Sequence, residues 1–268
     1  MWRGTVAAHL RVHFSDGALS TIFNFRSHPR GVGIEPTRLL EFITVTLQAG
    51  LKVSPLTLRL DRWCAHFARD LDGEHLCTSV AYGFDWEHDV PSQWYEVANH
   101  VPSEHWEKVD EKIEEMKMRG EVFVTTRESV CGIAPLLAVD KDHSMMKTIR
   151  LVHDLSSPKG GSVNDAQEIP SRRFASVRDM MLLMRPRALL CKVDISNAYR
   201  AMALAPRFWA LHVFQWRGVV YSDARLVFGS SGAPACFDRF TQAFQRLTTA
   251  QGYGCVGYMD DYMATASK

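Results

Sequence analysis

The sequence Tyr258-Met-Asp-Asp-Tyr-Met-Ala-Thr-Ala-Ser-Lys268 places two adjacent carboxylates, Asp260 and Asp261, inside an otherwise apolar run. The apolar flanks predict two short buried strands, and the aspartates predict the hairpin turn between them. Taken alone, this stretch is also compatible with an ordinary exposed Asp-Asp turn. Buried negative charges are costly unless a cation pairs with them, and Mg²⁺ is the hard divalent ion that prefers carboxylate and phosphate oxygens.

A third carboxylate stands at a comparable position upstream. Residues 188–194 predict a strand that ends in Asp194. The small-residue loop Gly229–Pro234 follows, and then a helix with Phe237 and Phe240 on one face that closes at Gly252. If the two strands lie side by side in one sheet, their carboxylates meet. Three such groups provide the oxygen ligands for two-metal phosphoryl transfer.

The remaining pattern predicts an α+β fold. Helical spacing covers residues 103–119, and a capping box at Ser176 opens a short helix that runs through Met184. Strand patterns cover residues 121–126, 133–139 and 148–153, and residues 208–221 predict a hairpin with Arg217-Gly218 at its turn. In the first hundred residues, helices are expected over residues 37–48 and from Ser54 to about Gly73.

Composition bounds the class of protein. The 268 residues are 46% hydrophobic and carry a net charge of +1, so a large core is expected and the whole chain is not strongly basic. Residues 141–192 hold ten Lys/Arg against five Asp/Glu, a local excess that suits phosphates or an ordinary solvated surface. The six cysteines form no Cys-x-x-Cys pair and are expected as buried free thiols. With no apolar run of 18 residues, we expect an intracellular protein of the cytoplasm or nucleus without a membrane.

Four motifs in order resemble those of a reverse transcriptase. Residues 193–199 (Val-Asp-Ile-Ser-Asn-Ala-Tyr) resemble the first palm motif, residues 226–234 the second, and Tyr258-Met-Asp-Asp261 the third. Upstream, Lys141-Asp142 and residues 150–156 resemble the fingers strands. The resemblance covers about Trp106 to Lys268. It implies the fingers and palm of a right-handed polymerase in residues 101–268, with an antiparallel palm sheet and helices on one face.

The polymerase motifs do not account for the first hundred residues, and the sequence ends soon after the last motif. Residues 1–100 are expected to form an N-terminal region of unknown role, mixed and partly helical. The sequence stops seven residues after Asp261, so the thumb is expected to be absent.

The resemblance also implies a role for each matching residue. Asp194, Asp260 and Asp261 would be the catalytic carboxylates, and with the backbone of Ile195 they would hold two Mg²⁺ ions, Mn²⁺ being an alternative. Tyr199 would stack under the sugar of the incoming dNTP and exclude a 2′-hydroxyl, although a simple core aromatic also fits this position.

The other dNTP contacts come from both subdomains. Arg150 would grip the triphosphate by a bidentate contact and Lys141 would add a point charge. Phe228 and Ala198 would line the nucleotide site, and Gly229 would let the backbone approach the nascent base pair.

Some positions depart from the retroviral pattern. Asn197 stands where retroviral enzymes have a second acid, Phe228 stands where they have glutamine, and Ser156 replaces a usual arginine. The Phe228-Gly229 form and the block from Arg150 to Asp165 resemble more closely the enzymes of pararetroviruses and tyrosine-recombinase retrotransposons.

The expected activity is template-directed DNA synthesis by a retroelement RNA-directed DNA polymerase, with an RNA or DNA template, a nucleic-acid primer and dNTP as partners. A template-directed RNA polymerase shares the palm logic, but Tyr199 argues against it. A decayed, non-catalytic remnant that binds nucleic acid or dNTP is the other alternative.

Overall fold

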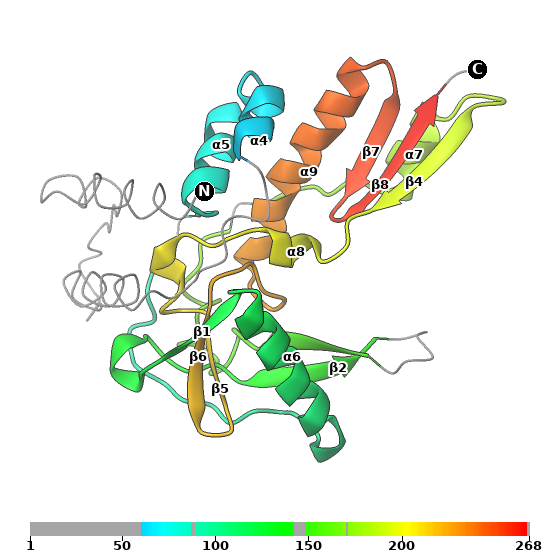
Figure 1. Ribbon diagram of the computed structural model, residues 1–268. Coiled ribbons are helices and arrows are strands. Elements are labelled where there is room, and N and C mark those ends of the chain that lie inside the picture. The colour runs from blue at the N-terminus through cyan, green and yellow to red at the C-terminus, as the bar shows by residue number, and fades with distance from the viewer. Residues whose placement is uncertain (1–59, 87–88, 142–147, 170, 267–268) are drawn as a thin grey trace, which may run out of the picture.

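The computed structural model describes residues 60–86, 89–141, 148–169 and 171–266 (Figure 1). The helix predicted over residues 37–48 and the beginning of the one predicted from Ser54 lie outside these residues. Across the described residues, none of the helices combines the length and the apolarity needed to cross a bilayer.

Three antiparallel strands form the sheet that carries the predicted carboxylates. β4 (Leu189–Asp194) pairs with β8 (Asp261–Ala266), which pairs with β7 (Gly254–Tyr258). The predicted strand and hairpin are therefore confirmed, except that Asp261 is the first residue of β8 and only Met259 and Asp260 form the turn. One consequence of β4 lying at the sheet edge is that Cys191 is an exposed thiol, against the expectation of buried ones.

Helices contact both faces of this sheet, so the expectation of helices on one face is wrong. α9 (Gly232–Ala250) packs against the face that carries Tyr262, whose ring lies 4.9 Å from the ring of Phe244. α7 (Val177–Leu183) contacts β7 from the other face, where Leu183 approaches Gly254. Successive residues of a strand face opposite sides of the sheet, and Gly254 and Gly257 are three residues apart, so they lie on opposite faces. Leu183 of α7 approaches the first glycine, and Thr241 of α9 approaches the second.

A second group of strands lies below the first sheet in Figure 1. β6 (Val219–Asp223) pairs with both β1 (Val122–Thr125) and β5 (Val213–Trp216), and β2 (Leu136–Asp140) pairs with β3 (Ile149–His153) as a hairpin. α6 (Trp106–Met118) packs beside them and buries its apolar stripe, Val109, Ile113 and Met116. The amphipathic spacing of this helix is thus confirmed.

Several helices and strands begin at residues other than those predicted. The predicted hairpin over residues 208–221 holds its strands only from Val213, because Pro206–Phe208 form a 3₁₀ turn (η3). Two further 3₁₀ turns, η1 (Ser103–His105) and η2 (Arg127–Ser129), flank α6 and β1. The predicted loop at residues 229–234 is helical from Gly232 onward, since the backbone N–H of Gly232 is capped by the Gln167 side chain at 2.8 Å. The capping box at Ser176 is present as predicted.

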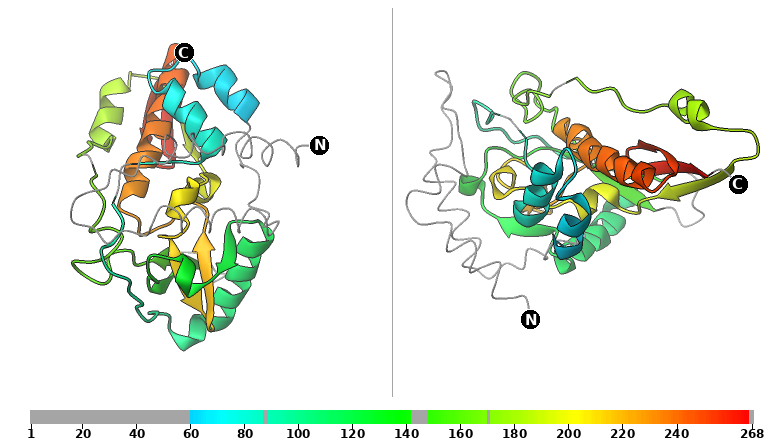
Figure 2. Two further views of the ribbon diagram at one scale, coloured as in Figure 1. Left: turned by 90° about the vertical axis from the view of Figure 1, so that its left-hand side faces the viewer. Right: turned by 90° about the horizontal axis from the view of Figure 1, so that it is seen from above.

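The described N-terminal residues pack on α9 (Figure 2). The helix predicted to stop near Gly73 ends earlier, with α4 (Leu60–Phe67), and a further helix, α5 (Gly73–Tyr82), begins where the predicted one was expected to stop. The Trp63 ring stacks on the Phe240 ring at 4.7 Å, and Arg246 donates to Asp70 at 2.8 Å. Residues 60–86 and the helix behind the carboxylate sheet therefore share one hydrophobic core.

This shared core predicts a steep cost for a substitution far from the sheet. Leu76 in α5 is fully buried, so Leu76→Ala should destabilise the protein by about 2–5 kcal/mol through lost burial and the cavity left behind. The matched control is Leu71→Ala, whose side chain is 91% exposed and which should change stability by less than about 0.5 kcal/mol. Urea denaturation measures both. Equal stabilities for the two variants would show that α5 does not belong to the core.

Candidate active site

The register of the sheet brings the three predicted carboxylates to one end of it. Asp194 is the direct cross-strand partner of Asp261. The backbone N–H of Ile195 donates to the carbonyl of Asp260 at 3.0 Å, which ties the end of β4 to the turn. Paired residues of an antiparallel ladder point to the same face, so Asp194 and Asp261 share the face opposite α9.

The turn between β7 and β8 is held in an unusual conformation. Met259 has a φ of 54°, in the left-handed region that a non-glycine residue occupies at a cost of roughly 1–2 kcal/mol. The hydroxyl of Thr241 in α9 donates to the Met259 carbonyl at 2.8 Å. A strained turn held by its helix fixes the direction in which Asp260 leaves the sheet.

A lysine neutralises part of this negative charge. Lys192 lies two residues before Asp194 on the same face, and its Nζ is 2.9 Å from Asp261 Oδ1. The pKa of Lys192 is raised, first by its hydrogen bond to Asp261 and then by the charges of Asp261, Asp194 and Asp260. The charges of all three aspartates thus act on one cation.

The donor set suits a hard divalent ion, although the side chains are not gathered around one point. Carboxylate oxygens are the ligands that Mg²⁺ prefers. Within the described part of the chain, however, no group of three His, Cys, Asp or Glu side chains stands ready to hold a metal. Asp261 is turned toward Lys192 instead. A metal ion held by these carboxylates would therefore require their side chains to rotate.

Tyr199, Phe228 and Arg150 form an aromatic group. The rings of Tyr199 and Phe228 lie 5.0 Å apart, and the Arg150 guanidinium sits over the Phe228 ring at 4.5 Å. Tyr199 also contacts the buried Phe237 ring at 5.5 Å. The pKa of the Tyr199 hydroxyl is raised, mainly by burial and next by the charge of Asp260. Three of the residues predicted to contact a nucleotide thus form one contiguous group, and the charge of Asp260 acts on one of them, Tyr199.

Close packing requires a glycine at position 229, and the sequence alone did not indicate this. Its φ is 105°, and a Cβ atom at this position would come within 1.7 Å of the His153 carbonyl oxygen. The backbone N–H of His153 donates to the Phe228 carbonyl at 2.9 Å. The glycine therefore lets the loop lie directly on the end of β3. Its predicted approach to a nascent base pair stays a prediction.

The other predicted site residues lie just after the end of β4, in α8 (Ala198–Ala201) and beyond β2. Ala198 is buried at the first position of α8, a single helical turn, and Ile195 packs partly against the core. Lys141 is exposed just beyond β2, where its N–H donates to the Thr148 carbonyl at 2.8 Å. No contact places Lys141 with the aromatic group. Asn197, where retroviral enzymes have an acid, adopts a φ of 52°, which asparagine tolerates better than most residues.

Asn164 contributes to the site without having been predicted. Its amide nitrogen donates to the Gly229 carbonyl at 2.8 Å, and its amide oxygen accepts from the Ser231 backbone N–H at 2.9 Å. This side chain therefore holds the loop that follows Phe228. The pairing spans more than sixty residues, and nothing in the local sequence signals it.

A buried ion cluster lies behind the aromatic group and was also missed. Arg200 Nη1 donates to Asp223 Oδ2 at 2.6 Å, and Arg200 Nη2 donates to Glu121 Oε2 at 2.9 Å. His153 Nε2 lies 3.5 Å from Asp223 Oδ2, and the Arg225 backbone N–H donates to Asp223 Oδ1 at 2.9 Å. Burial alone would raise the pKa of Asp223, but Arg200 and His153 outweigh it and hold the pKa below its usual value.

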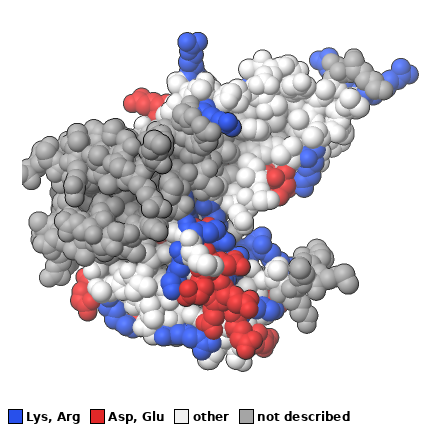
Figure 3. Space-filling model, viewed as in Figure 1, with Lys and Arg blue, Asp and Glu red and all other residues white. Residues whose placement is uncertain are grey.

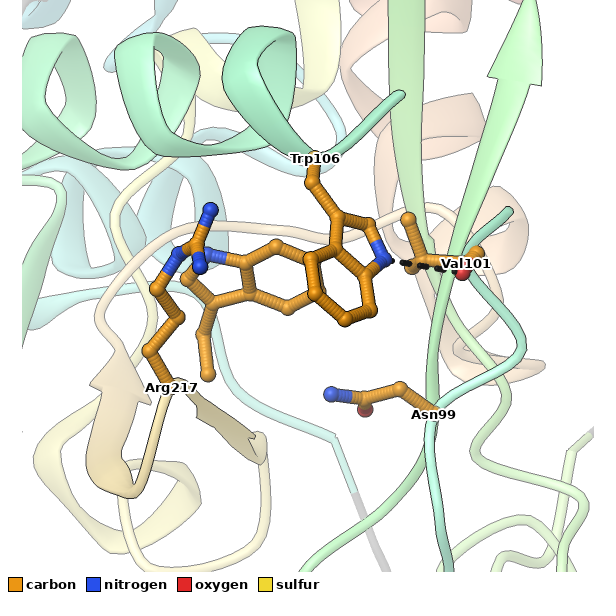
Figure 4. A pocket seen from close by; sticks show the side chains of 5 residues that line it. Asn99, Val101, Trp106 and Arg217 are labelled. Carbon is orange, nitrogen blue, oxygen red and sulfur yellow. Dashed lines mark hydrogen bonds between the residues drawn. The ribbon is translucent and has the colours of Figure 1, made fainter. Parts of the chain in front are cut away.

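A separate pocket of about 350 Å³ lies between the start of α6 and the β5–β6 turn (Figure 4). Its walls are Asn99, Val101, Trp106, Trp216 and Arg217. The Arg217 guanidinium lies 5.3 Å from the Trp106 ring, and Asp110 accepts hydrogen bonds from Arg217. None of the predicted site residues lines this pocket.

Acidic side chains gather over α6 in Figure 3, on a part of the surface apart from the β4–β8–β7 sheet. The α6 sequence supplies them: Glu107, Asp110, Glu111, Glu114 and Glu115. Ion pairs along the helix, such as Lys117 with Glu114 at 2.7 Å, balance part of the charge. This face is a solvated helix surface rather than a phosphate-binding one.

Comparison with known proteins gives a fold and no family. No protein-family profile and no curated protein sequence matches the chain. Among solved structures, the crystal structure of the native prototype foamy virus protease–reverse transcriptase is similar with a TM-score of 0.55 and 17% identity, over 70% of this chain and 23% of that one. The chain thus has a reverse-transcriptase-like fold.

Two related complexes give the same result. The foamy viral protease–reverse transcriptase dRH in complex with double-stranded DNA is similar with a TM-score of 0.54 and 16% identity, over 79% of this chain and 39% of that one. The complex with an RNA/DNA hybrid has a TM-score of 0.53 and 17% identity, over 79% and 30%. This chain therefore spans less than half the length of the structures described here.

The contact at Gly229 predicts a difference between two glycines that share a left-handed backbone. Gly252→Ala, at φ 91° in open space, should cost about 1–2 kcal/mol from backbone strain. Gly229→Ala should cost roughly 1–3 kcal/mol more, because the added methyl group meets the His153 carbonyl. Urea denaturation of the two variants tests this, and equal losses would show that the loop does not lie on β3.

The ion cluster predicts a pH dependence of stability. A folded-state pKa below the usual value means that ionised Asp223 stabilises the fold fully above about pH 4 and that this stabilisation is lost as the pH falls further. Asp223→Asn should cost about 3–5 kcal/mol at pH 7, since it leaves Arg200 short of a partner, and should flatten the acid side of the profile.

Urea denaturation between pH 3 and 8 measures both effects. Asp140→Asn, at a carboxylate that is 61% exposed, is the control and should follow the wild-type profile. If Asp223→Asn is as stable as the wild type at pH 7, the buried pairs do not exist in solution.

Proposed function

We propose that this chain is the fingers and palm part of a retroelement reverse transcriptase, an RNA-directed DNA polymerase that transfers a nucleotide from dNTP to a primer 3′-hydroxyl. The observation that carries the proposal is the β4–β8 register, which sets Asp194 opposite Asp261 beside the Asp260 turn. Tyr199, whose hydroxyl is influenced by the charge of Asp260, packs against Phe228. The reverse-transcriptase-like fold supports the same conclusion.

In this proposal the carboxylates of Asp194, Asp260 and Asp261, with the carbonyl of Ile195, hold two Mg²⁺ ions, and Mn²⁺ is an alternative. When bound, the ions would lower the pKa of the primer hydroxyl and neutralise the leaving pyrophosphate. The chain's own contribution is to fix the ligands on a paired ladder and a helix-braced turn. Lys192 would release Asp261 as the metal takes over its charge.

The aromatic group would recognise the nucleotide. Tyr199, packed between Phe228 and Phe237, would lie under the sugar and leave no room for a 2′-hydroxyl. Arg150 is held over Phe228, where its planar guanidinium can meet a phosphate by two parallel hydrogen bonds. Lys141, Ala198 and Gly229 would complete the dNTP site.

The partners in this proposal are an RNA or DNA template, a nucleic-acid primer and dNTP, inside the cell. The similar foamy viral structures hold double-stranded DNA or an RNA/DNA hybrid. Duplex binding would rest on phosphate contacts rather than on base sequence. The Phe228-Gly229 form and the block from Arg150 to Asp165 favour a pararetroviral or tyrosine-recombinase element over a retroviral one.

Isothermal titration with dGTP in Mg²⁺ tests the proposal on this chain directly. The wild type should bind dGTP only with the metal present, and Asp194→Asn should weaken that binding by about tenfold or more through loss of a ligand. Asp110→Asn is the control, because Asp110 accepts hydrogen bonds from Trp216 and Arg217, neither of which belongs to the proposed site. Binding that ignores both Mg²⁺ and Asp194→Asn would overturn the metal site. Metal-dependent binding without any single-nucleotide primer extension would favour a non-catalytic remnant.

A further inference from the structure

Arg200 is the centre of the buried ion cluster. Its Nε and Nη2 both donate to Glu121 Oε2, at 3.0 and 2.9 Å, while Nη1 reaches Asp223 at 2.6 Å. Only 16% of the Arg200 side chain is exposed, and the Asp223 side chain is fully buried. A planar guanidinium can serve two carboxylates at once in fixed directions, which a lysine cannot.

The helical turn that bears Arg200 needs such an external hold. α8 has four residues, and its described backbone bonds are Ala201 N–H to the Asn197 carbonyl at 3.1 Å and Met202 N–H to the Tyr199 carbonyl at 3.0 Å. One turn of helix is not stable by itself, because fixing its backbone costs more than its hydrogen bonds return. Tyr199 and Arg200 are neighbours in this turn, so the anchor of one sets the position of the other.

The same cluster touches the other two segments of the proposed nucleotide site. His153, which pairs with Asp223 at 3.5 Å, ends the strand that carries Arg150. The backbone of His153 also binds the Phe228 carbonyl at 2.9 Å. Thus the segments that bear Tyr199, Arg150 and Phe228 all contact one group of buried charges.

Stability alone does not account for this arrangement. Burying several charges is costly, and well-packed apolar residues of similar volume often stabilise a fold as well or better. What an ion cluster with a forked arginine supplies in addition is a fixed direction for each of its members. That property is useful where three segments must keep one geometry.

We propose that Arg200 is a positioning residue for nucleotide selection: by its pairs with Glu121 and Asp223 it holds α8 so that the Tyr199 ring stays against Phe228 and discriminates dNTP from rNTP. This role rests on the proposed function. The holding of α8 itself is independent of that function and can be measured without a nucleotide.

The test compares Arg200→Met with Arg200→Lys, and with Arg246→Met as the matched control. Arg246 is also a partly buried arginine paired with a carboxylate, Asp70, but it lies near the far end of α9. Hydrogen exchange followed by mass spectrometry reports on the amides of Ala201 and Met202, and titration with dGTP and GTP in Mg²⁺ gives the sugar preference. Tyr199→Ala supplies the reference for lost discrimination.

Arg200→Met should raise exchange at Ala201 and Met202 by about tenfold or more while the α9 amides keep wild-type protection. Its dGTP-over-GTP preference should fall toward that of Tyr199→Ala, with a smaller change in dGTP binding itself. Arg200→Lys should be intermediate in both readouts, and it carries the test if the methionine variant does not fold. Arg246→Met should change neither.

Wild-type exchange in α8 together with wild-type sugar preference for both Arg200 variants would overturn the proposal. A uniform rise in exchange that includes α9 would also overturn it, because Arg200 would then act only on global stability. If the wild-type chain binds no nucleotide in Mg²⁺, the proposed function fails, and the role in selection fails with it. The exchange result then still decides whether Arg200 holds α8.

Discussion

The antiparallel register of β4 on β8 is the constraint from which the candidate site follows. Side chains alternate along a strand, so Asp261 and its neighbour Tyr262 point to opposite faces of the sheet. The buried ring of Tyr262 packs against Phe244 of α9 and thereby turns Asp261 to the other face. The pairing of β4 with β8 sets Asp194 beside Asp261 on that face, and a slip of one residue would turn Asp194 away from it.

The aspartates of the candidate site and the buried Asp223 have opposite environments. Asp194 and Asp260 are exposed and remain close to water, where ionised carboxylates cost little and can accept an incoming cation. Asp223 is fully buried, and its charge is balanced permanently by Arg200 inside the protein. The exposed aspartates can exchange one cation for another, whereas the buried Asp223 keeps Arg200 as its partner. In the proposed site, the first group could change its partner during a cycle while the second stays fixed.

Local patterns predicted much of the fold, and contacts distant in sequence explain the rest. Three elements could be predicted from the sequence because each depends on spacing within about a dozen residues. They are the hairpin around Asp260, the strand that ends in Asp194 and the helix that buries Val109. The start of α9 at Gly232 was not, since the Gln167 side chain that caps it is 65 positions away. The ion cluster was missed for the same reason: Arg200 and Glu121 are 79 positions apart. A helix pattern also says nothing about which face of a sheet the helix will cover.

The packing of α4 and α5 on α9 has a consequence for where this chain can be cut. The motifs alone invite a truncation that begins at residue 101, just before α6. Such a cut would remove Trp63 from the Phe240 ring and Asp70 from Arg246, and it would open the outer side of α9 to water. The same helix carries Thr241, which holds the turn before Asp260. A boundary drawn from the motifs would therefore disturb the aspartates that the motifs identify.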